Sequence, residues 1–212
     1  MTEVKICGVN TPAALAAAAA AGADFVGFVF FPASPRAVTP EQAGAISVAQ
    51  PGGPARVGLF VDPGDDALAA TLAAVPLDVI QLHGAETPAR VAAIRARFGV
   101  PVMKAIGIGD ASDAATIPAY AAVSDRLLLD AKPAPDAALP GGNAHPFEWG
   151  LLAGVAIGRP WLLAGGLTPG NVAAAIAAAG APGVDVSSGV ERARGVKDAG
   201  LIRDFVAAAR RG

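Results

Sequence analysis

A repeated unit, in which one apolar run is followed by one helix-forming stretch, organises the whole chain. The apolar runs are rich in Val, Ile, Leu and Phe, are bounded by Gly, Pro or Asp, and begin near Val4, Phe25, Val57, Val79, Val100, Leu127, Trp161 and Val184. Such runs are typical of buried strands. Their average spacing of about 26 residues suits one strand, one helix and two loops. We therefore predict a regular alternation of strands and helices over residues 1–212.

The predicted helices carry their own start and stop signals. Threonine caps a helix well because its hydroxyl accepts a free backbone N–H, and proline suits the first helical position. Glycine ends helices because it adopts positive φ without strain. Four stretches begin with Thr-Pro, at Thr11-Pro12, Thr39-Pro40, Thr87-Pro88 and Thr168-Pro169, and three reach a terminal glycine, at Gly22, Gly99 and Gly180.

Eight such units predict an α/β fold, a closed (β/α)₈ TIM barrel in a single domain. An open doubly wound sheet is the alternative, but it seldom needs eight regular units, and no Gly-x-Gly-x-x-Gly sequence follows the first strand. The hydrophobic content of 53% is sufficient for a buried core. Barrels of this kind bind substrates at the carboxyl ends of their strands, so we expect the active site at that face.

The charge and the cysteine content exclude several classes of function. With 16 basic and 18 acidic residues, and without a basic cluster, the chain is not expected to bind nucleic acid or a membrane surface. Glu3 and Lys5 interrupt any signal peptide, so we expect a cytoplasmic protein. One cysteine forms no internal disulfide, and the distant His83 and His145 provide no metal-ligand spacing, so we expect no metal. A small molecule is the expected partner.

Two side chains with acid-base chemistry end predicted strands. Because strand side chains alternate, Val4 and Ile6 should face the helices, while Lys5 and Cys7 point into the barrel. The same alternation sends Asp130 inward from the sixth strand, where a carboxylate suggests a general acid or base. The alternatives are a small buried cysteine, and an aspartate that caps a helix or forms a salt bridge.

Glycine and serine follow the seventh and eighth predicted strands, where barrels of this type commonly bind phosphate. Backbone N–H groups that glycine leaves accessible can approach phosphate oxygens closely. Two tight turns without a ligand are the alternative. We predict a phosphate site formed by Gly165, Gly166, Ser187, Ser188 and Gly189.

Two loops at the predicted active face are long. The loop FFPASPRAV contains one cation, Arg36, which can pair with a carboxylate or a phosphate, although an exposed surface arginine is the commoner case. The loop AKPAPDAALPGGNAHPFEW, residues 131–149, is expected to be mobile because of its glycines and prolines. Gln81 points inward and is a candidate to bind the ligand, whereas His83 is equally consistent with a loop cap.

Taken together, the strand-end motifs resemble those of the phosphoribosylanthranilate isomerase family of tryptophan biosynthesis. The resemblance rests on KICG, GFVFFPASPR, VGLFV, IQLHG, LLLDAK, LAGGLTPGNV and GVDVSSGVE, followed by GVKD, and runs in order from Lys5 to about Asp198. VGLFV or LAGGL alone is a weak signal, but KICG, SPR, QLHG and DVSSGVE together are highly specific. The family has the (β/α)₈ fold.

The resemblance implies an Amadori rearrangement that needs no cofactor and no metal. The aminoaldose N-(5'-phosphoribosyl)anthranilate becomes 1-(2-carboxyphenylamino)-1-deoxyribulose 5'-phosphate. An acid protonates the furanose ring oxygen, and a base removes the proton from C2'. Carried onto this sequence, the motifs make Asp130 the acid and Cys7 the base, and we expect the thiol pKa to be tuned toward neutral pH.

The same resemblance assigns the residues that hold the substrate. Arg36 is expected to bind the anthranilate carboxylate. Gln81 and Asp185 are further substrate-binding residues, and the phosphate goes to the glycine and serine loops. We expect this phosphorylated small molecule to be the partner of a monomer or a homodimer.

The chain departs from the family pattern within its long sixth loop. Asn143-Ala144-His145 follow the Gly141-Gly142 pair, where a further glycine is usual, and Glu148 stands where Asp is common. This departure bears on the loop and its contact with the substrate, whereas the catalytic positions match the family.

Two other functions remain open from the sequence. The isomerase of histidine biosynthesis acts on a related aminoaldose, but it has carboxylates at both catalytic positions and a twofold internal repeat, and Cys7 argues against it. A barrel that binds a phosphorylated metabolite or a partner protein without catalysis is the second alternative. The presence of both Cys7 and Asp130 disfavours this second alternative. A turnover assay distinguishes an enzyme from a barrel that only binds.

Overall fold

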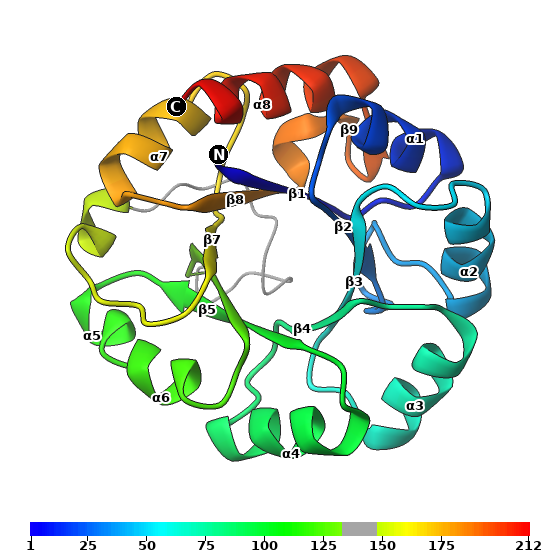
Figure 1. The fold of residues 1–212 in the computed structure, drawn as a ribbon, viewed down its shortest axis with the longest axis horizontal. Helices are drawn as coiled ribbons and strands as arrows, with labels where there is room; N and C mark the ends of the chain where they lie inside the picture. The colour runs from blue at the N-terminus through cyan, green and yellow to red at the C-terminus, as the bar shows by residue number, and fades with distance from the viewer. Residues whose placement is uncertain (133–147) are drawn as a thin grey trace.

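Eight parallel strands form a closed barrel in the computed structural model, which describes residues 1–132 and 148–212 (Figure 1). The strands pair in chain order, and β1 pairs with β8 to close the ring. They are β1 (Glu3–Cys7), β2 (Phe25–Val29), β3 (Ala55–Phe60), β4 (Val79–Leu82), β5 (Val102–Ile108), β6 (Arg126–Ala131), β7 (Trp161–Leu163) and β8 (Gly183–Val186). The predicted (β/α)₈ barrel is confirmed, and every strand begins within two residues of its predicted start.

Helices surround the ring of strands on its outer side (Figure 1). They are α1 (Pro12–Ala21), α2 (Pro40–Val48), α3 (Asp65–Ala74), α4 (Pro88–Phe98), α5 (Ala111–Ala114), α6 (Ile117–Ala121), α7 (Val172–Ala179) and α8 (Ala199–Arg211). Two 3₁₀ helices, η1 (Trp149–Leu152) and η2 (Ser188–Val190), and a hairpin of β9 (Glu191–Ala193) and β10 (Val196–Lys197) complete the described elements. Among the described residues, no helix is long and apolar enough to span a membrane.

The loop expected to be mobile falls mainly on residues 133–147, which lie outside the described residues. This gap includes His145 and most of the loop's departures from the family pattern, and the expectation of mobility stays a prediction.

Three of the four Thr-Pro starts are helix caps as predicted. The hydroxyls of Thr11, Thr39 and Thr87 each accept the backbone N–H three residues later, at 3.2, 3.2 and 3.3 Å. The three terminal glycines, Gly22, Gly99 and Gly180, all adopt left-handed conformations, with φ of 80°, 64° and 62°. Local side-chain chemistry is therefore enough to set these helix ends.

The fourth Thr-Pro prediction, at Thr168, is wrong. Helix α7 begins later, at Val172, and Asn171 is its N-cap residue. The Asn171 side chain accepts the Thr168 N–H at 2.7 Å and donates to the Gly166 carbonyl at 3.0 Å. These two hydrogen bonds close the segment into a turn before the helix starts, because asparagine competes with helix geometry for nearby backbone groups.

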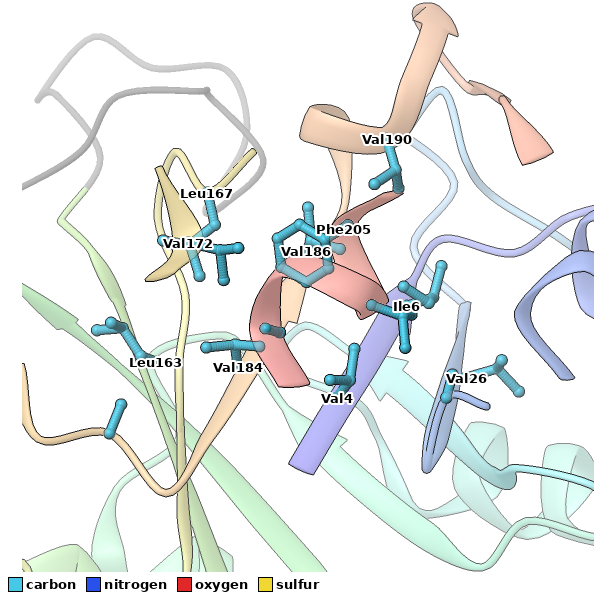
Figure 2. Close-up of a cluster of buried hydrophobic side chains, with 14 of the residues drawn as sticks. Val4, Ile6, Val26, Leu163, Leu167, Val172, Val184, Val186, Val190 and Phe205 are labelled. Carbon is cyan, nitrogen blue, oxygen red and sulfur yellow. The ribbon is translucent and has the colours of Figure 1, made fainter. Parts of the chain in front are cut away.

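The alternation of side chains along the strands separates two cores. Leu127 and Leu129 of β6 belong to the cluster between barrel and helices, whereas Leu128 belongs to a separate cluster inside the barrel. Figure 2 shows the outer cluster where Phe205 of α8 meets β1 and β8, with Val4, Ile6, Val184 and Val186. The interior cluster consists of Phe25, Val57, Val79, Met103, Ala105, Leu128, Leu162 and Ala164. These side chains fill the inside of the barrel, which is therefore a packed core and no open pore.

Replacing Phe205 by Ala should lower the free energy of unfolding by about 3 to 5 kcal/mol, because the ring is fully buried and its loss leaves a cavity against β1 and β8. Urea denaturation measures this change. Val48→Ala, at a position that is 78% exposed, is the control and should alter stability by less than about 0.5 kcal/mol. Similar losses in the two variants would contradict the packing role of α8.

Candidate active site

Cys7 ends β1 and its side chain lies inside the barrel, where the residue is 5% exposed. A Cβ atom built on Gly27 of neighbouring β2 would lie 3.1 Å from Cys7 Sγ and 3.3 Å from Lys5 Nζ. The thiol and the ammonium group therefore converge over the bare backbone of Gly27. The inward direction expected for Lys5 and Cys7 is observed, and glycine suits this position of β2 because even a Cβ atom there would stand closer to both groups than ordinary contact.

The environment of Cys7 raises the pKa of its thiol above the ordinary value. Burial is the largest cause, since it disfavours the charged thiolate. The Lys5 cation lowers the pKa, the Asp185 carboxylate raises it, and the Lys197 cation lowers it. The expected tuning toward neutral pH is therefore wrong for the protein without substrate, because the two cations offset only part of the loss of hydration.

Lys5 forms a buried ion pair with Asp185 of β8, with 2.7 Å between Nζ and Oδ1. The two residues are register neighbours on β1 and β8. Burial opposes the charged form of Lys5, but Asp185 and Cys7 together outweigh it, and the pKa of Lys5 is raised. This contact occupies one oxygen of Asp185, Oδ1. The substrate-binding role that the sequence assigned to Asp185 stays a prediction.

Asp130 lies at the end of β6 and both of its oxygens have partners. Oδ1 accepts the Ala131 N–H at 2.8 Å, and Oδ2 lies 3.3 Å from His83 Nε2. His83 Nδ1 is in turn 2.9 Å from the amide nitrogen of Gln81. This contact orients the imidazole so that its other nitrogen, Nε2, faces Asp130.

Gln81 is fully buried beneath His83, and its Oε1 has no partner among the described residues. The structure thus places Gln81 where it orients the imidazole, and the predicted contact with the ligand stays a prediction. The sequence left two roles open for His83, a loop cap and a contact with the ligand. Its contact with Asp130 brings it into the site.

A second buried ion pair holds the loop that carries His83. Lys104 Nζ lies 2.8 Å from Glu86 Oε2 and donates to the carbonyls of Leu82 and Gly84 at 3.2 and 2.7 Å. Glu86 also accepts the Asp62 N–H at 2.8 Å. These bonds fix the backbone on both sides of His83, so the imidazole is held by a rigid loop.

Arg36 is buried and paired, in contrast to the exposed arginine that was the commoner expectation. Its residue exposure is 5%, and Nε and Nη2 donate to the two carboxylate oxygens of Glu191 at 2.7 and 3.0 Å. Among the described residues, none accepts a hydrogen bond from Nη1. One edge of the guanidinium group is therefore occupied, and Nη1 is available for a ligand.

The predicted phosphate loops touch one another. Gly165 and Gly166 have φ of 91° and 63°, and a Cβ on Gly165 would lie 2.7 Å from the Ala131 nitrogen. A Cβ on Gly189 would lie only 1.8 Å from the Leu167 carbonyl oxygen, so the loop after β8 rests directly on the loop after β7. Ser187 and Ser188 are half-buried beside them. The five predicted residues are thus brought to one region.

Three charged residues near the site, Lys5, Glu191 and Lys197, received no functional role from the sequence. Each lies inside a motif on which the family resemblance rests, KICG, DVSSGVE or GVKD. Membership of these motifs was the one sequence feature that pointed to a role for them. Their partners lie far away in the chain, so spacing alone does not reveal the pairing. In residues 1–132 and 148–212, no group of three or more His, Cys, Asp or Glu side chains could hold a metal ion.

Comparisons with known proteins agree over nearly the whole chain. The family model described as N-(5'phosphoribosyl)anthranilate (PRA) isomerase matches residues 4–208. The N-(5'-phosphoribosyl)anthranilate isomerase of Paracoccus denitrificans (strain Pd 1222) is 63% identical over 207 residues, covering 98% of this chain and 96% of that protein.

Two solved structures are similar over their full length. Monomers of the dimeric phosphoribosylanthranilate isomerase from Thermotoga maritima superpose with a TM-score of 0.86 at 35% identity, with both chains covered completely. A phosphoribosylanthranilate isomerase in complex with reduced 1-(o-carboxyphenylamino)-1-deoxyribulose 5-phosphate superposes with a TM-score of 0.87 at 35% identity, again over 100% of both chains.

The raised pKa of Cys7 predicts that its thiolate forms only above the ordinary thiol value of about 8.5. The ultraviolet absorbance of the thiolate, followed against pH, measures this directly, because Cys7 is the single cysteine of the chain. The Cys7→Ser variant provides the baseline. Lys5→Met should shift the midpoint to still higher pH, whereas Lys132→Met, at a half-exposed lysine paired with Asp113, should leave it unchanged. A wild-type midpoint below the ordinary value would show that the cations dominate over burial.

Proposed function

Because the chain belongs to the N-(5'-phosphoribosyl)anthranilate isomerase family, we propose that Cys7 and Asp130 are the base and the acid of its reaction. The protein is an isomerase of tryptophan biosynthesis, which performs the Amadori rearrangement of N-(5'-phosphoribosyl)anthranilate to 1-(2-carboxyphenylamino)-1-deoxyribulose 5'-phosphate. Its substrate is a phosphorylated small molecule. One observation carries the proposal: Cys7 and Asp130 end strands that are separated by β7 and β8 on one side of the ring and by β2 to β5 on the other.

The acid step opens the sugar. Asp130 gives its proton to the furanose ring oxygen, the bond from that oxygen to C1' breaks, and the anthranilate nitrogen supplies the electron pair that forms the Schiff base. The Ala131 N–H and His83 Nε2 face the two oxygens of Asp130. Both groups stabilise the carboxylate that remains after transfer, and they hold it in one orientation.

The base step follows on the other side of the sugar. The Cys7 thiolate removes the proton from C2', and the electron pair of that bond moves to the Schiff base to give the enolamine. The enolamine hydroxyl at C2' then loses its proton while C1' gains one, which yields the aminoketose. Lys5 and Lys197 support this step because their positive charges lower the pKa of Cys7 and so oppose the effect of burial.

The two ends of the substrate have separate partners in this proposal. The anthranilate carboxylate binds Arg36 through Nη1, which Glu191 leaves available. The phosphate binds the backbone N–H groups and hydroxyls of Gly165, Gly166, Ser187, Ser188 and Gly189, whose loops are in contact. Gln81 and Asp185 are the further substrate-binding residues of this proposal, and each also holds a neighbour, Gln81 the His83 ring and Asp185 the Lys5 ammonium group. The active site thus occupies the carboxyl-end face of the barrel, within a single domain.

We further infer a monomer or a homodimer in the cytoplasm. The similar enzyme from Thermotoga maritima is described as dimeric, which supports the second of these states. Sedimentation analysis of the purified protein distinguishes them.

The direct test of the activity is turnover. Purified protein is mixed with freshly made N-(5'-phosphoribosyl)anthranilate, and the loss of the substrate's fluorescence is followed. The expected result is enzyme-dependent loss without an added cofactor or metal. Absence of turnover by folded protein would overturn the activity itself.

Cys7→Ser and Asp130→Asn should each keep the fold and substrate binding but lose at least about two decades of kcat, the range for removal of a general acid or base. A serine alcohol has too high a pKa to supply the anion, and an amide has no proton to give to the ring oxygen. Steady-state kinetics and thermal unfolding of both variants check this. Near-native turnover by Cys7→Ser, or a loss of activity caused only by unfolding, would make Cys7 a packing residue.

A further inference from the structure

Glu191 joins two cations that come from different parts of the barrel mouth. Its carboxylate accepts four hydrogen bonds: from Arg36 Nε and Nη2, at 2.7 and 3.0 Å, from Lys197 Nζ at 2.8 Å, and from the Gly195 N–H at 3.0 Å. The side chains of Arg36, Glu191 and Lys197 are only 6%, 4% and 1% exposed. Burial alone would raise the pKa of Glu191, but the Arg36 hydrogen bond, the charge and hydrogen bond of Lys197 and the Gly195 N–H together lower it to about 2. Glu191 is therefore an anion near neutral pH, and its four hydrogen bonds hold the groups around it.

On the first side, Glu191 sets the direction of Arg36. The arginine stem crosses Gly8, the residue after Cys7, so closely that a Cβ on Gly8 would lie 2.6 Å from Arg36 Cδ. With the stem fixed there and one edge of the guanidinium bound to both oxygens of Glu191, rotation about the last side-chain bonds is removed. Nη1 then keeps a single orientation, which is what binding a planar carboxylate requires.

On the second side, Glu191 sets the position of Lys197. Lys197 Nζ donates to the Ser187 carbonyl at 2.8 Å, and its contact with Glu191 keeps it there. A trans peptide is planar, with its C=O and N–H pointing in opposite directions. Anchoring the Ser187 carbonyl on Lys197 therefore turns the Ser188 N–H away from Lys197, and that N–H belongs to the predicted phosphate loop.

The buried group of Arg36, Glu191 and Lys197 has a net positive charge. Its two cations and one anion lie together, so one positive charge remains to attract an incoming anion. Without Glu191, two buried cations would face each other unpaired, which is strongly unfavourable. Both would then move, and both ends of the substrate would lose their partners.

We infer that Glu191 is a positioning residue for both ends of the substrate: through Arg36 it orients the group that binds the carboxylate, and through Lys197 it orients the turn that binds the phosphate. The inference rests on the proposed function. It adds that one residue, Glu191, is the shared support of the carboxylate subsite and the phosphate subsite, whose residues lie far apart in the sequence. It assigns Lys197 to the phosphate side and places neither residue in contact with the reacting atoms.

Binding of two probes tests this without relying on turnover. Anthranilate, followed by its fluorescence, reports the carboxylate subsite, and inorganic phosphate, followed by calorimetry, reports the phosphate subsite. Glu191→Gln should weaken both probes about tenfold or more, the loss expected when a charge-assisted hydrogen bond is removed. Lys197→Met should weaken mainly phosphate, and Arg36→Lys mainly anthranilate. In turnover, Glu191→Gln should raise KM because both ends of the substrate lose oriented partners, and kcat should fall as well because Lys197, once displaced, no longer favours the Cys7 thiolate.

The matched control is Glu3→Gln, which breaks another paired Arg–Glu contact at the opposite end of the barrel. There Arg126 Nη1 and Nη2 donate to Glu3 at 2.7 and 2.8 Å, and neither probe should change its affinity. If Glu191→Gln does not fold, Glu191→Asp replaces it: the shorter side chain keeps the charge but cannot reach both cations, so both probes should again weaken.

Loss of anthranilate binding alone, or unchanged binding of both probes in the Glu191 variant, would overturn the shared support. If the folded wild-type protein binds both probes but turns over no substrate, the proposed function fails while the inference about Glu191 stands. If the wild type turns over substrate and the Glu191 variant binds both probes normally, only the inference fails.

Discussion

The pairing of β1 with β8 is the contact on which the rest of the structure depends. It joins residues at the two ends of the chain, such as Val4 with Val184, and turns an open sheet into a ring without edges. The same seam carries the buried Lys5–Asp185 ion pair, and Phe205 of α8 covers its outer side. Because the ring is closed and parallel, the carboxyl ends of all eight strands meet at one face. Cys7, Asp130 and the glycine loops come together for that reason.

Several buried ion pairs lie at the carboxyl-end face of the barrel. Lys5 with Asp185, Lys104 with Glu86, and Arg36 and Lys197 with Glu191 are all paired inside the structure, where an unpaired charge would be costly. These pairs fix the positions of the groups that we propose surround the substrate, and a site whose polar groups are already in place needs little reorganisation during the reaction. The same exclusion of water raises the pKa of Cys7, and the neighbouring cations supply the opposing effect.

Much of this architecture was predictable because its causes are local. Strand side chains alternate, so the inward direction of Cys7 and Asp130 and the outward direction of Val4 and Ile6 followed from the pattern of apolar residues. Threonine caps and terminal glycines act over a few residues, and they were correct except at Thr168, where Asn171 competes for the backbone. The contacts of Arg36 with Glu191 and of His83 with Asp130 were not predictable, because each joins loops on different strands.

By itself, the sequence determined the repeated strand-helix unit, the closed barrel and the family to which the motifs point. All of these depend on the order of residue types along the chain, and hydrophobic periodicity and capping act between near neighbours. Only the tertiary structure decided which charges neutralise one another, which edge of Arg36 remains available, and in which direction the Cys7 pKa moves. Those properties depend on distance and on the exclusion of water, and both arise only when residues far apart in the sequence, such as Lys5 and Asp185, are brought together by closure of the barrel.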